Sequence, residues 1–230
     1  MRVGINSYFL REPFTGMGNH LAYLLDALDA RGAGDERYSL LVPRFPGEPS
    51  PLGPSLPGRP PAPRTVLGPL PRRFDAIEAR SGLPRLPLQL SKLWWEQAGI
   101  LLAGRRAQID LLHSPYWTNP LWSPWPTVVT VHDVIQLVLP EYRMLARQRV
   151  YFALVTRALR HATAIITVSE CSRQDLVRIA GIPVERVHVV ENAIPDMLAP
   201  VRDPDRLAAV RARYGLADPF ILYLGANDRR

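Results

Sequence analysis

The sequence has 230 residues, of which 47% are apolar and 21% are charged, a composition typical of a chain that folds around a core and not of a disordered tail. Its formal charge is +7, and its single cysteine, Cys171, excludes an internal disulfide. Prolines interrupt its longest charge-free stretch, so no membrane-spanning helix of roughly 20 apolar residues is expected. Because no secretory leader is visible either, we expect a cytoplasmic protein.

Short apolar strands alternate with amphipathic helices along most of the chain. The patterns predict strands at 2–8, 38–42, 110–113, 127–131, 164–168, 187–190 and 220–224, and helices at 21–31, 88–104, 151–159, 170–180 and 204–214. The helix at 88–104 is expected to bury a stripe that includes Leu90, Leu93, Trp94, Leu101 and Leu102. The alternation indicates an α/β fold, a Rossmann-like parallel sheet with helices on both faces.

A proline-rich segment interrupts this pattern. Thirteen of the 24 prolines lie between Pro43 and Pro87, where we expect an irregular, extended insertion. Between Pro43 and Arg106 ten basic residues exceed four acidic ones, a net charge of +6, and the same stretch holds Trp94 and Trp95. The segment is either a solvated loop or a surface for anionic lipid headgroups or an anionic acceptor. No nucleic-acid recognition motif accompanies the charge, so nucleic acid is not an expected partner.

Candidate site residues follow the strands, because ligands of parallel sheets bind at the carboxyl ends of the strands. These positions are Gly16, Gly18, His132, Asp133, Ser169, Glu170 and Asn192. The loop expected at Gly16 and Gly18 would present backbone N–H groups to an anion, or would simply require positive φ. Leu21 stands where a dinucleotide fingerprint has its third glycine, which disfavours NAD.

His132 and Asp133 follow the β-branched strand at 127–131. His132 could hydrogen-bond to a hydroxyl or a phosphate with Asp133 orienting its ring, or the pair could only end the strand and start a turn. Asp203 and Asp205 resemble a metal-binding acidic pair, but Pro204 between them favours a helix cap, so no metal site is expected. The other histidines, His20, His113, His161 and His188, form no recognisable constellation.

Several segments together carry a family resemblance: TGMGNH at 15–20, DLLHSPYW at 110–117, PTVVTVHDVIQLVLPE at 126–141, ATAIITVSECSRQDLVRIAGIPVERVHVVENAI at 162–194 and FILYLG at 220–225. In this order they resemble the amino-terminal half of a family 4 glycosyltransferase, and most of all the mannosyltransferase-like enzymes of bacterial polysaccharide biosynthesis. The resemblance covers nearly the whole chain outside 43–87. It implies a GT-B architecture, in which two Rossmann-like domains face each other across a cleft.

The resemblance also implies roles for particular residues. Gly16 and Gly18 would line the cleft beside the donor phosphates, His132 would hydrogen-bond to the transferring sugar with Asp133 beside it, and Ser169 would lie near the cleft. Arg230 matches an arginine that grips the donor diphosphate. Residues 1–199 would form the acceptor-side domain, and residues 200–230 a linker and the first strand of a donor-binding domain. We therefore expect this stretch of chain to bind acceptor and to be inactive by itself.

The activity implied is a retaining transfer from a nucleotide sugar to a lipid-linked or polysaccharide acceptor, without metal or cofactor, at the inner face of the membrane. Two alternatives stay open. One is a sugar-nucleotide epimerase or phosphorylase of the same architecture, which product analysis with a labelled nucleotide sugar would distinguish. The other is a non-catalytic half domain that binds a glycan or a protein partner.

Overall fold

The computed structural model describes residues 1–12, 15–31, 34–48, 73–81, 87–139, 145–193, 199–216 and 219–223. The chain forms two compact units, Met1–Asn192 and Ala193–Arg230, which are described separately. Within the described residues, every helix is too short or too polar to cross a bilayer. The first unit contains β1 (Arg2–Asn6), α1 (Gly16–Arg31), β2 (Arg37–Arg44), β3 (Phe74–Arg80), α2 (Leu88–Trp94), α3 (Ile100–Ala107), β4 (Leu111–Ser114), β5 (Thr127–Val131), α4 (Ile135–Val138), α5 (Ala146–Leu159), β6 (Ala164–Thr167), α6 (Glu170–Ala180) and β7 (Val187–Val189).

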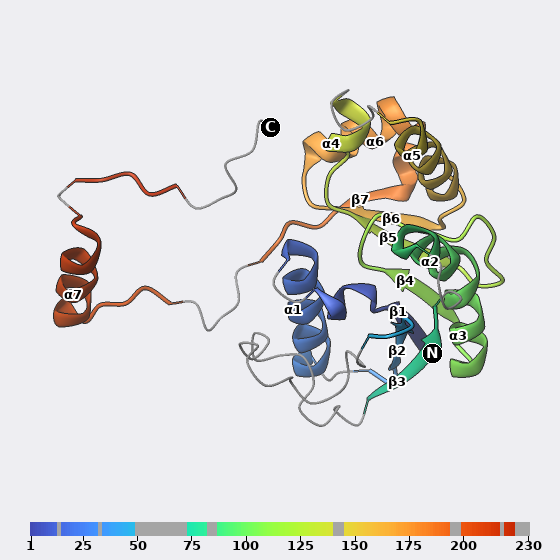
Figure 1. Cartoon of the computed structure of the whole chain (residues 1–230), viewed down its shortest axis with the longest axis horizontal. Coiled ribbons are helices and arrows are strands. Elements are labelled where there is room, and N and C mark those ends of the chain that lie inside the picture. The colour runs from blue at the N-terminus through green and yellow to red at the C-terminus, as the bar shows by residue number, and fades with distance from the viewer. Residues whose placement is uncertain are drawn as a thin grey trace. The chain divides into compact units, whose positions relative to one another are not determined.

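The seven strands form one parallel sheet in the order β3-β2-β1-β4-β5-β6-β7 (Figure 1). In the register of its centre, Ile5 of β1 pairs with Leu40 of β2 on one side and with His113 of β4 on the other. The chain first builds outward from β1 to β3 and then returns to add β4 on the other side of β1. This arrangement confirms the Rossmann-like α/β fold and makes the boundary between β1 and β4 the point where the strand order reverses, which is where such sheets bind ligands.

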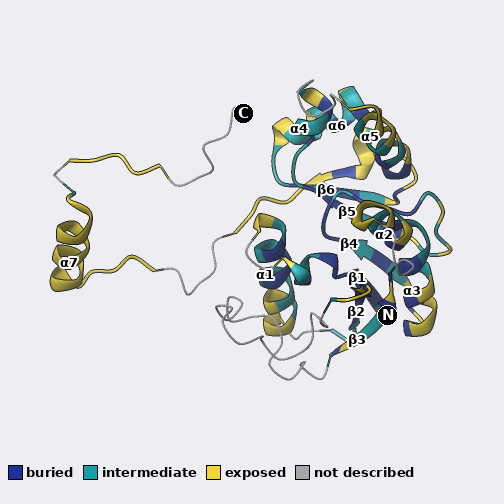
Figure 2. Ribbon diagram, viewed as in Figure 1, coloured by how far each residue is buried: buried dark blue, intermediate teal, exposed yellow. Residues whose placement is uncertain are grey.

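Helices cover both faces of the β1–β2 region (Figure 1). Leu21 of α1 packs against Ile5 and Leu40, whereas Trp95 and the helix α3 pack against Leu41. Leu40 and Leu41 are neighbours in one strand, so their side chains point to opposite faces of the sheet. The burial pattern of Figure 2 follows from this arrangement, since buried residues concentrate in the strands.

The other half of the sheet has its own core. Val129 of β5 and Ile165 of β6 contact Leu159 of α5 and Leu176 of α6, and all four side chains are buried. The end of α6 is set by Gly181, whose φ of 65° is left-handed and terminates the helix as the sequence predicts. In the second unit, α7 (Pro204–Tyr214) begins as expected, with the side chain of Asp203 accepting hydrogen bonds from the N–H groups of Asp205 and Arg206.

The helix expected at 88–104 differs from the prediction. It is interrupted by a π-helical turn at Trp95–Gly99, which adds a residue to one turn and shifts the buried face. Leu90 and Leu102 of the predicted stripe are therefore half exposed, at 50% and 47%, while Trp95 and Ile100 are fully buried. The burial of Trp95 also removes it from any membrane surface, so the paired-tryptophan part of the membrane hypothesis is wrong.

Two expected regions are also corrected. The segment expected to be irregular contains β3 at Phe74–Arg80, which pairs with β2 along its whole length. Residues 49–72 and 82–86 of the same segment lie outside the described residues. The strand predicted at 220–224 is absent from its described part, Phe220–Tyr223, whose side chains are exposed. A strand requires a paired neighbour, and the described residues of the second unit provide none.

Candidate functional site

The candidate site lies at the carboxyl edge of the sheet, beside the boundary of β1 and β4. His132 follows directly on Val131, the last residue of β5. Its Nε2 lies 3.3 Å from the carbonyl oxygen of Pro115, in the loop after β4. Because a carbonyl only accepts, Nε2 must donate this hydrogen bond, and Nδ1 of the neutral ring keeps its lone pair. Burial lowers the pKa of His132, although Pro115 and Asp133 oppose the shift, so the neutral form dominates near pH 7.

His20 of α1 packs against His132. The two ring centroids are 4.5 Å apart with an interplanar angle of 81°, an edge-to-face arrangement. Burial, and then the neighbouring His132, lower the pKa of His20 to about 4, while a hydrogen bond to the side chain of Asn192 opposes this shift. The loop after β7 therefore contributes Asn192 to the same group.

A third histidine lies behind this pair. Nε2 of His113, on β4, is 3.1 Å from Oγ1 of Thr130 on the neighbouring strand β5. Burial, followed by the effect of His20, lowers the pKa of His113 to about 4. The expectation that His20 and His113 join no constellation is thus wrong. The signal available in the sequence was position, since α1 follows β1 and must start at the carboxyl edge of the sheet.

The amino end of α6 is tied to His132. The Ser169 side chain caps the helix by accepting a hydrogen bond of 3.1 Å from the N–H of Ser172, and the two hydroxyls lie 3.1 Å apart. The hydroxyl of Ser172 in turn donates to the backbone carbonyl of His132 over 3.4 Å. Ser169 is therefore near the candidate site, with its hydroxyl in a hydrogen-bonded chain. Glu170 is exposed and pairs with Arg173, whose hydrogen bond lowers the pKa of Glu170.

Asp133 follows the second of its two sequence interpretations, the start of a turn, whereas the two glycines lie differently from the expected loop. Oδ1 of Asp133 accepts from the N–H of Ile135 and so starts the turn of α4, while Pro115 orients the ring of His132. Gly16 and Gly18 belong to the first turn of α1 and not to a loop. The N–H of Gly18 donates to the hydroxyl of Thr15 over 3.1 Å.

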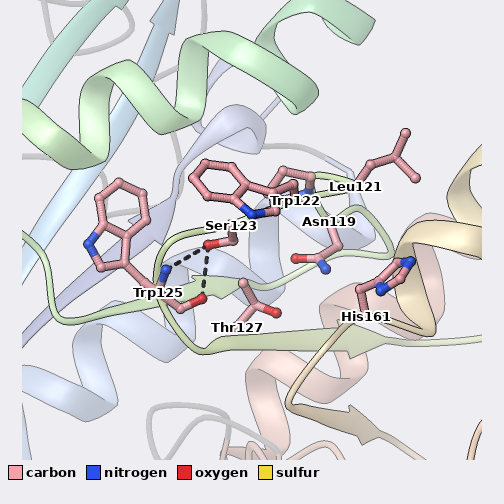
Figure 3. Close-up of a pocket in the computed structure, with 8 residues that line it drawn as sticks. Asn119, Leu121, Trp122, Ser123, Trp125, Thr127 and His161 are labelled. Carbon is pink, nitrogen blue, oxygen red and sulfur yellow. Dashed lines mark hydrogen bonds between the residues drawn. The ribbon is translucent and has the colours of Figure 1, made fainter.

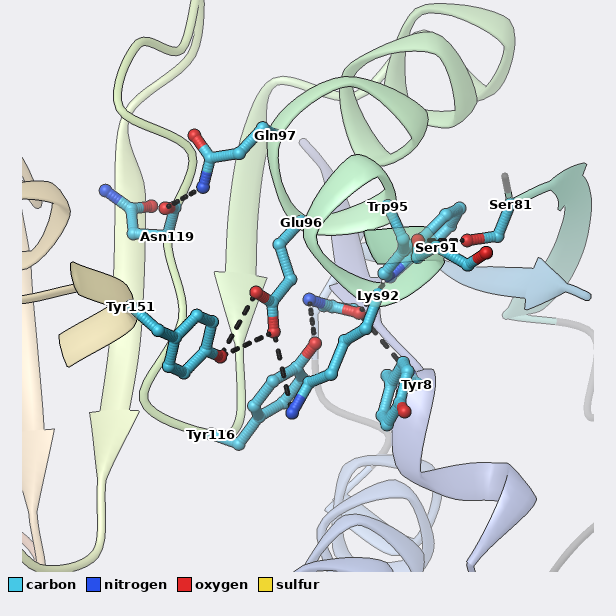
Figure 4. Close-up of polar contacts among 11 residues, drawn as sticks. Tyr8, Ser81, Ser91, Lys92, Trp95, Glu96, Gln97, Tyr116, Asn119 and Tyr151 are labelled. Carbon is cyan, nitrogen blue, oxygen red and sulfur yellow. Dashed lines mark hydrogen bonds and ion pairs between the residues drawn. The ribbon is translucent and has the colours of Figure 1, made fainter. Parts of the chain in front are cut away.

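A buried polar network supports the carboxyl edge from the side of α2 (Figure 4). Glu96, in the π-helical turn, is 1% exposed. The hydroxyl of Tyr151, from α5, lies 3.2 Å from both carboxylate oxygens of Glu96, and Nζ of Lys92 lies 3.8 Å from one of them. Burial raises the pKa of Glu96, against the influence of Lys92 and Tyr151.

The network reaches the switch point of the sheet through Asn6, the last residue of β1. Nε1 of Trp95 donates to Oδ1 of Asn6, and Nδ2 of Asn6 donates to the hydroxyl of Tyr116, each over 3.1 Å. The Lys92 ammonium lies 5.1 Å from the ring centre of Tyr8, within cation–π range. Sequence reasoning missed Glu96 because a single charged residue in a helix ordinarily faces solvent.

Some sequence expectations cannot be placed. Arg230 lies outside the described residues, as does most of the proline-rich segment. Within the described part of the chain, no three His, Cys, Asp or Glu side chains form a group that could hold a metal ion.

Comparison with known proteins places the chain in a family. The model of Glycosyltransferase Family 4 matches residues 14–196. The chain belongs to this family. This family 4 glycosyltransferase is 31% identical over 104 residues to O-antigen chain mannosyltransferase B of Escherichia coli, a match that covers 45% of this chain and 27% of that protein. It is 36% identical over 69 residues to alpha-D-kanosaminyltransferase of Streptomyces kanamyceticus, covering 30% of this chain and 18% of that protein.

Solved structures of glycosyltransferases share the fold. WaaG, a glycosyltransferase involved in lipopolysaccharide biosynthesis, matches 95% of this family 4 chain with a TM-score of 0.59 and 14% identity, over 52% of its own length. HepE of Anabaena, in complex with UDP-glucose, matches 95% of this chain with a TM-score of 0.52 and 14% identity, over 50% of its length. The family 4 chain thus spans about half of each, which confirms the expected α/β unit that matches one half of a GT-B structure.

Proposed function

We propose that this family 4 glycosyltransferase transfers a sugar from a nucleotide sugar to a lipid-linked or polysaccharide acceptor, and that residues 1–199 form the acceptor-side domain. The names of its relatives support this direction, since they include an O-antigen chain mannosyltransferase and a glycosyltransferase of lipopolysaccharide biosynthesis. HepE, which shares the fold, was solved with UDP-glucose. The chain spans about half the length of these two structures. The donor, acceptor and product of the whole enzyme are therefore part of what we propose.

His132 is the residue that we propose to contact the transferring sugar. The Pro115 carbonyl holds the ring through Nε2, so that Nδ1 of the neutral ring can accept a hydrogen bond from a hydroxyl of the transferring sugar. Positive charge develops at the anomeric carbon during transfer, and a neutral imidazole stabilises that charge where an imidazolium would repel it. Burial, which lowers the pKa of His132, favours this neutral form. The hydrogen bond accelerates transfer to the extent that it strengthens in the transition state.

The remaining site residues have supporting roles in the proposal. Gly16 and Gly18 belong to the first turn of α1, and in this proposal the donor phosphates bind beside that helix end, where the helix dipole favours an anion. Ser169 and Asp133 lie beside His132 and contact the sugar. Arg230 binds the donor diphosphate, as part of residues 200–230 leading into a donor-binding domain. The transfer retains anomeric configuration and proceeds without a metal.

The test is a transfer assay with the protein made from its complete gene. Labelled UDP- and GDP-sugars are offered together with lipid-linked glycan acceptors, in buffer with and without EDTA. We expect label to pass to the acceptor from one donor, with the donor's anomeric configuration and unaffected by EDTA. Isomerised donor in the absence of acceptor would instead identify an epimerase, and release of sugar phosphate from a glycan a phosphorylase. Absence of turnover with every donor would leave a binding protein and contradict the proposal.

A further inference from the structure

A polar pocket lies in the loop between β4 and β5, at the edge of the sheet opposite to His132. It has a volume of about 190 Å³ and is lined by residues 119–123, Trp125, Thr127 and His161 (Figure 3). Thr127 is the first residue of β5 and His132 follows the last, so the length of this strand, roughly 16 Å, separates the two sites. The pocket is thus distinct from the proposed site of transfer.

The pocket contains an unpartnered acceptor. Asn119 is 2% exposed, and its Nδ2 donates to the carbonyl oxygen of Ala158 over 3.1 Å. Because that carbonyl only accepts, the orientation of the amide is fixed and Oδ1 is the free end. Oδ1 has no hydrogen-bond partner among the described residues. In Figure 3 it points toward the side of the pocket where Thr127 lies. A buried acceptor of this kind indicates a ligand or solvent that donates a hydrogen bond.

An aromatic surface adjoins this acceptor. Trp122 is 62% exposed, an unusual position for the largest apolar side chain. Trp125 is held differently, since a Cβ at Gly104 would come within 2.9 Å of its ring, which shows that the indole lies directly on α3. The pocket therefore combines one fixed indole, one exposed indole and polar groups. That combination suits a ligand with an apolar face and a rim of hydroxyls.

The loop that carries the pocket is held in place before any ligand binds. The side chain of Gln97, in the π-helical turn, donates to the carbonyl oxygen of Asn119 over 3.2 Å and accepts from the N–H of Leu121 over 2.9 Å. The hydroxyl of Ser123 donates to the carbonyl of Trp125 and accepts from its N–H. A site that is already ordered loses little conformational entropy on binding.

The geometry points to a carbohydrate subsite that takes a single pyranose ring of a glycan, with the ring stacked on Trp122 and its hydroxyls facing the polar side of the pocket, where Asn119 and Thr127 lie. The volume lies below the ~300–1,000 Å³ of pockets for drug-sized ligands, so it suits one sugar ring better than a whole nucleotide sugar. That the glycan is the growing acceptor rests on the proposed function. The binding of a sugar ring does not.

The test observes the indole N–H signals of the 230-residue chain, which has five tryptophans. Methyl α-D-mannopyranoside, its glucoside and its galactoside are each titrated into ¹⁵N-labelled protein, and glycerol serves as the hydroxyl control. We expect one pyranoside to shift the Trp122 signal with a Kd on the order of 1 mM, as weak single-ring ligands do, and glycerol to leave it unchanged. The Trp122 signal is assigned from its loss in Trp122→Phe.

Variants decide between stacking and nonspecific contact. Because Trp122 is on the surface, we expect Trp122→Ala to fold and to weaken binding by at least about tenfold, while Trp122→Tyr, which keeps an aromatic face, stays within about threefold. Trp94→Phe, outside the pocket, should leave the Kd unchanged. The subsite is disproved if no pyranoside shifts the signal, if glycerol shifts it equally, or if Trp122→Ala binds like the wild type. No donor or transfer is needed, so this result is independent of the transfer assay.

Discussion

The rings of His20 and His132 meet edge to face, 4.5 Å between centroids, although one residue lies on α1 and the other follows β5. The contact joins the first βα unit to the centre of the sheet at its carboxyl edge. Burial lowers the pKa of both histidines, which disfavours the protonated form of each ring. The pair is therefore a neutral, packed element of the candidate site.

The first prediction concerns stability and pH. The folded pKa of about 4 for His20 and for His113 lies below the ordinary histidine value of 6.5, so the unfolded chain binds protons that the folded chain does not. Their contribution to stability is complete above pH 6.5 and is lost as the pH falls from 6.5 toward 4. Urea unfolding at about pH 7 and about pH 5 should show this loss, reduced in His20→Gln but not in the exposed-site control His188→Gln. Equal losses in both variants would contradict the assignment.

A second prediction separates the role of Gly16 from a structural one. A Cβ at this position would meet no atom within 4 Å, and its place in the first turn of α1 is compatible with alanine. Gly16→Ala should therefore unfold at the same urea concentration as the wild type or slightly above it. If the backbone here approaches the donor phosphates, the added methyl group should nevertheless raise the KM for the donor. Unchanged donor kinetics would remove Gly16 from the site.

Ser169 provides a third prediction because its cap and its proposed contact with sugar can be separated. Ser169→Ala removes the acceptor for the N–H of Ser172 and should lower the free energy of unfolding by about 1 kcal/mol. Ser169→Asp restores a capping oxygen and should recover most of that stability. If the hydroxyl contacts the sugar, Ser169→Asp will still transfer slowly. Recovery of full transfer by Ser169→Asp would show that Ser169 serves only as a cap.

The buried carboxylate of Glu96 gives the fourth prediction. Glu96→Ala leaves Lys92 and the Tyr151 hydroxyl without their partner in the interior, and should cost about 3–5 kcal/mol of unfolding free energy. Glu96→Gln keeps the shape and one carbonyl oxygen for Tyr151, so it should cost much less. Thermal or urea unfolding of the two variants provides the measurement. A small cost for both variants would mean that the polar network contributes little to the stability of the carboxyl edge, and an equally large cost for both would mean that the charge of Glu96, and not its shape, is what the network requires.

The regular parts of the fold follow from local pattern. The strand at 127–131 is rich in β-branched residues and is predicted correctly. The helix starts at Ser169 and Asp203 are also predicted correctly, because their side chains accept hydrogen bonds from the free N–H groups of the first turn. The helix at 88–104 is not, because periodicity of 3.6 residues cannot anticipate a π-helical turn. β3 was missed because prolines surround it and its charged residues suit an edge strand.

The sequence predicts only some residues of the candidate site, for a similar reason. Position after a strand singles out His132 and Ser169, since all parallel strands end at the same edge of the sheet. Asn192 is singled out in the same way, and its side chain hydrogen-bonds to His20. His20 and His113 join the group through tertiary contacts between segments about a hundred residues apart along the chain, which no local pattern encodes. Pro115 orients His132 through a backbone carbonyl, a role that is independent of side-chain type.

The most direct test of the proposed function compares His132→Ala with His188→Ala in the protein made from its complete gene. Both remove one imidazole, but His132 lies at the carboxyl edge of the sheet and His188 is exposed on β7. Because His132 is proposed to act in the transition state, His132→Ala should lower kcat by about 100-fold or more with little change in the donor KM, and His188→Ala should retain wild-type kinetics. Wild-type kcat in a folded His132→Ala variant would contradict the account.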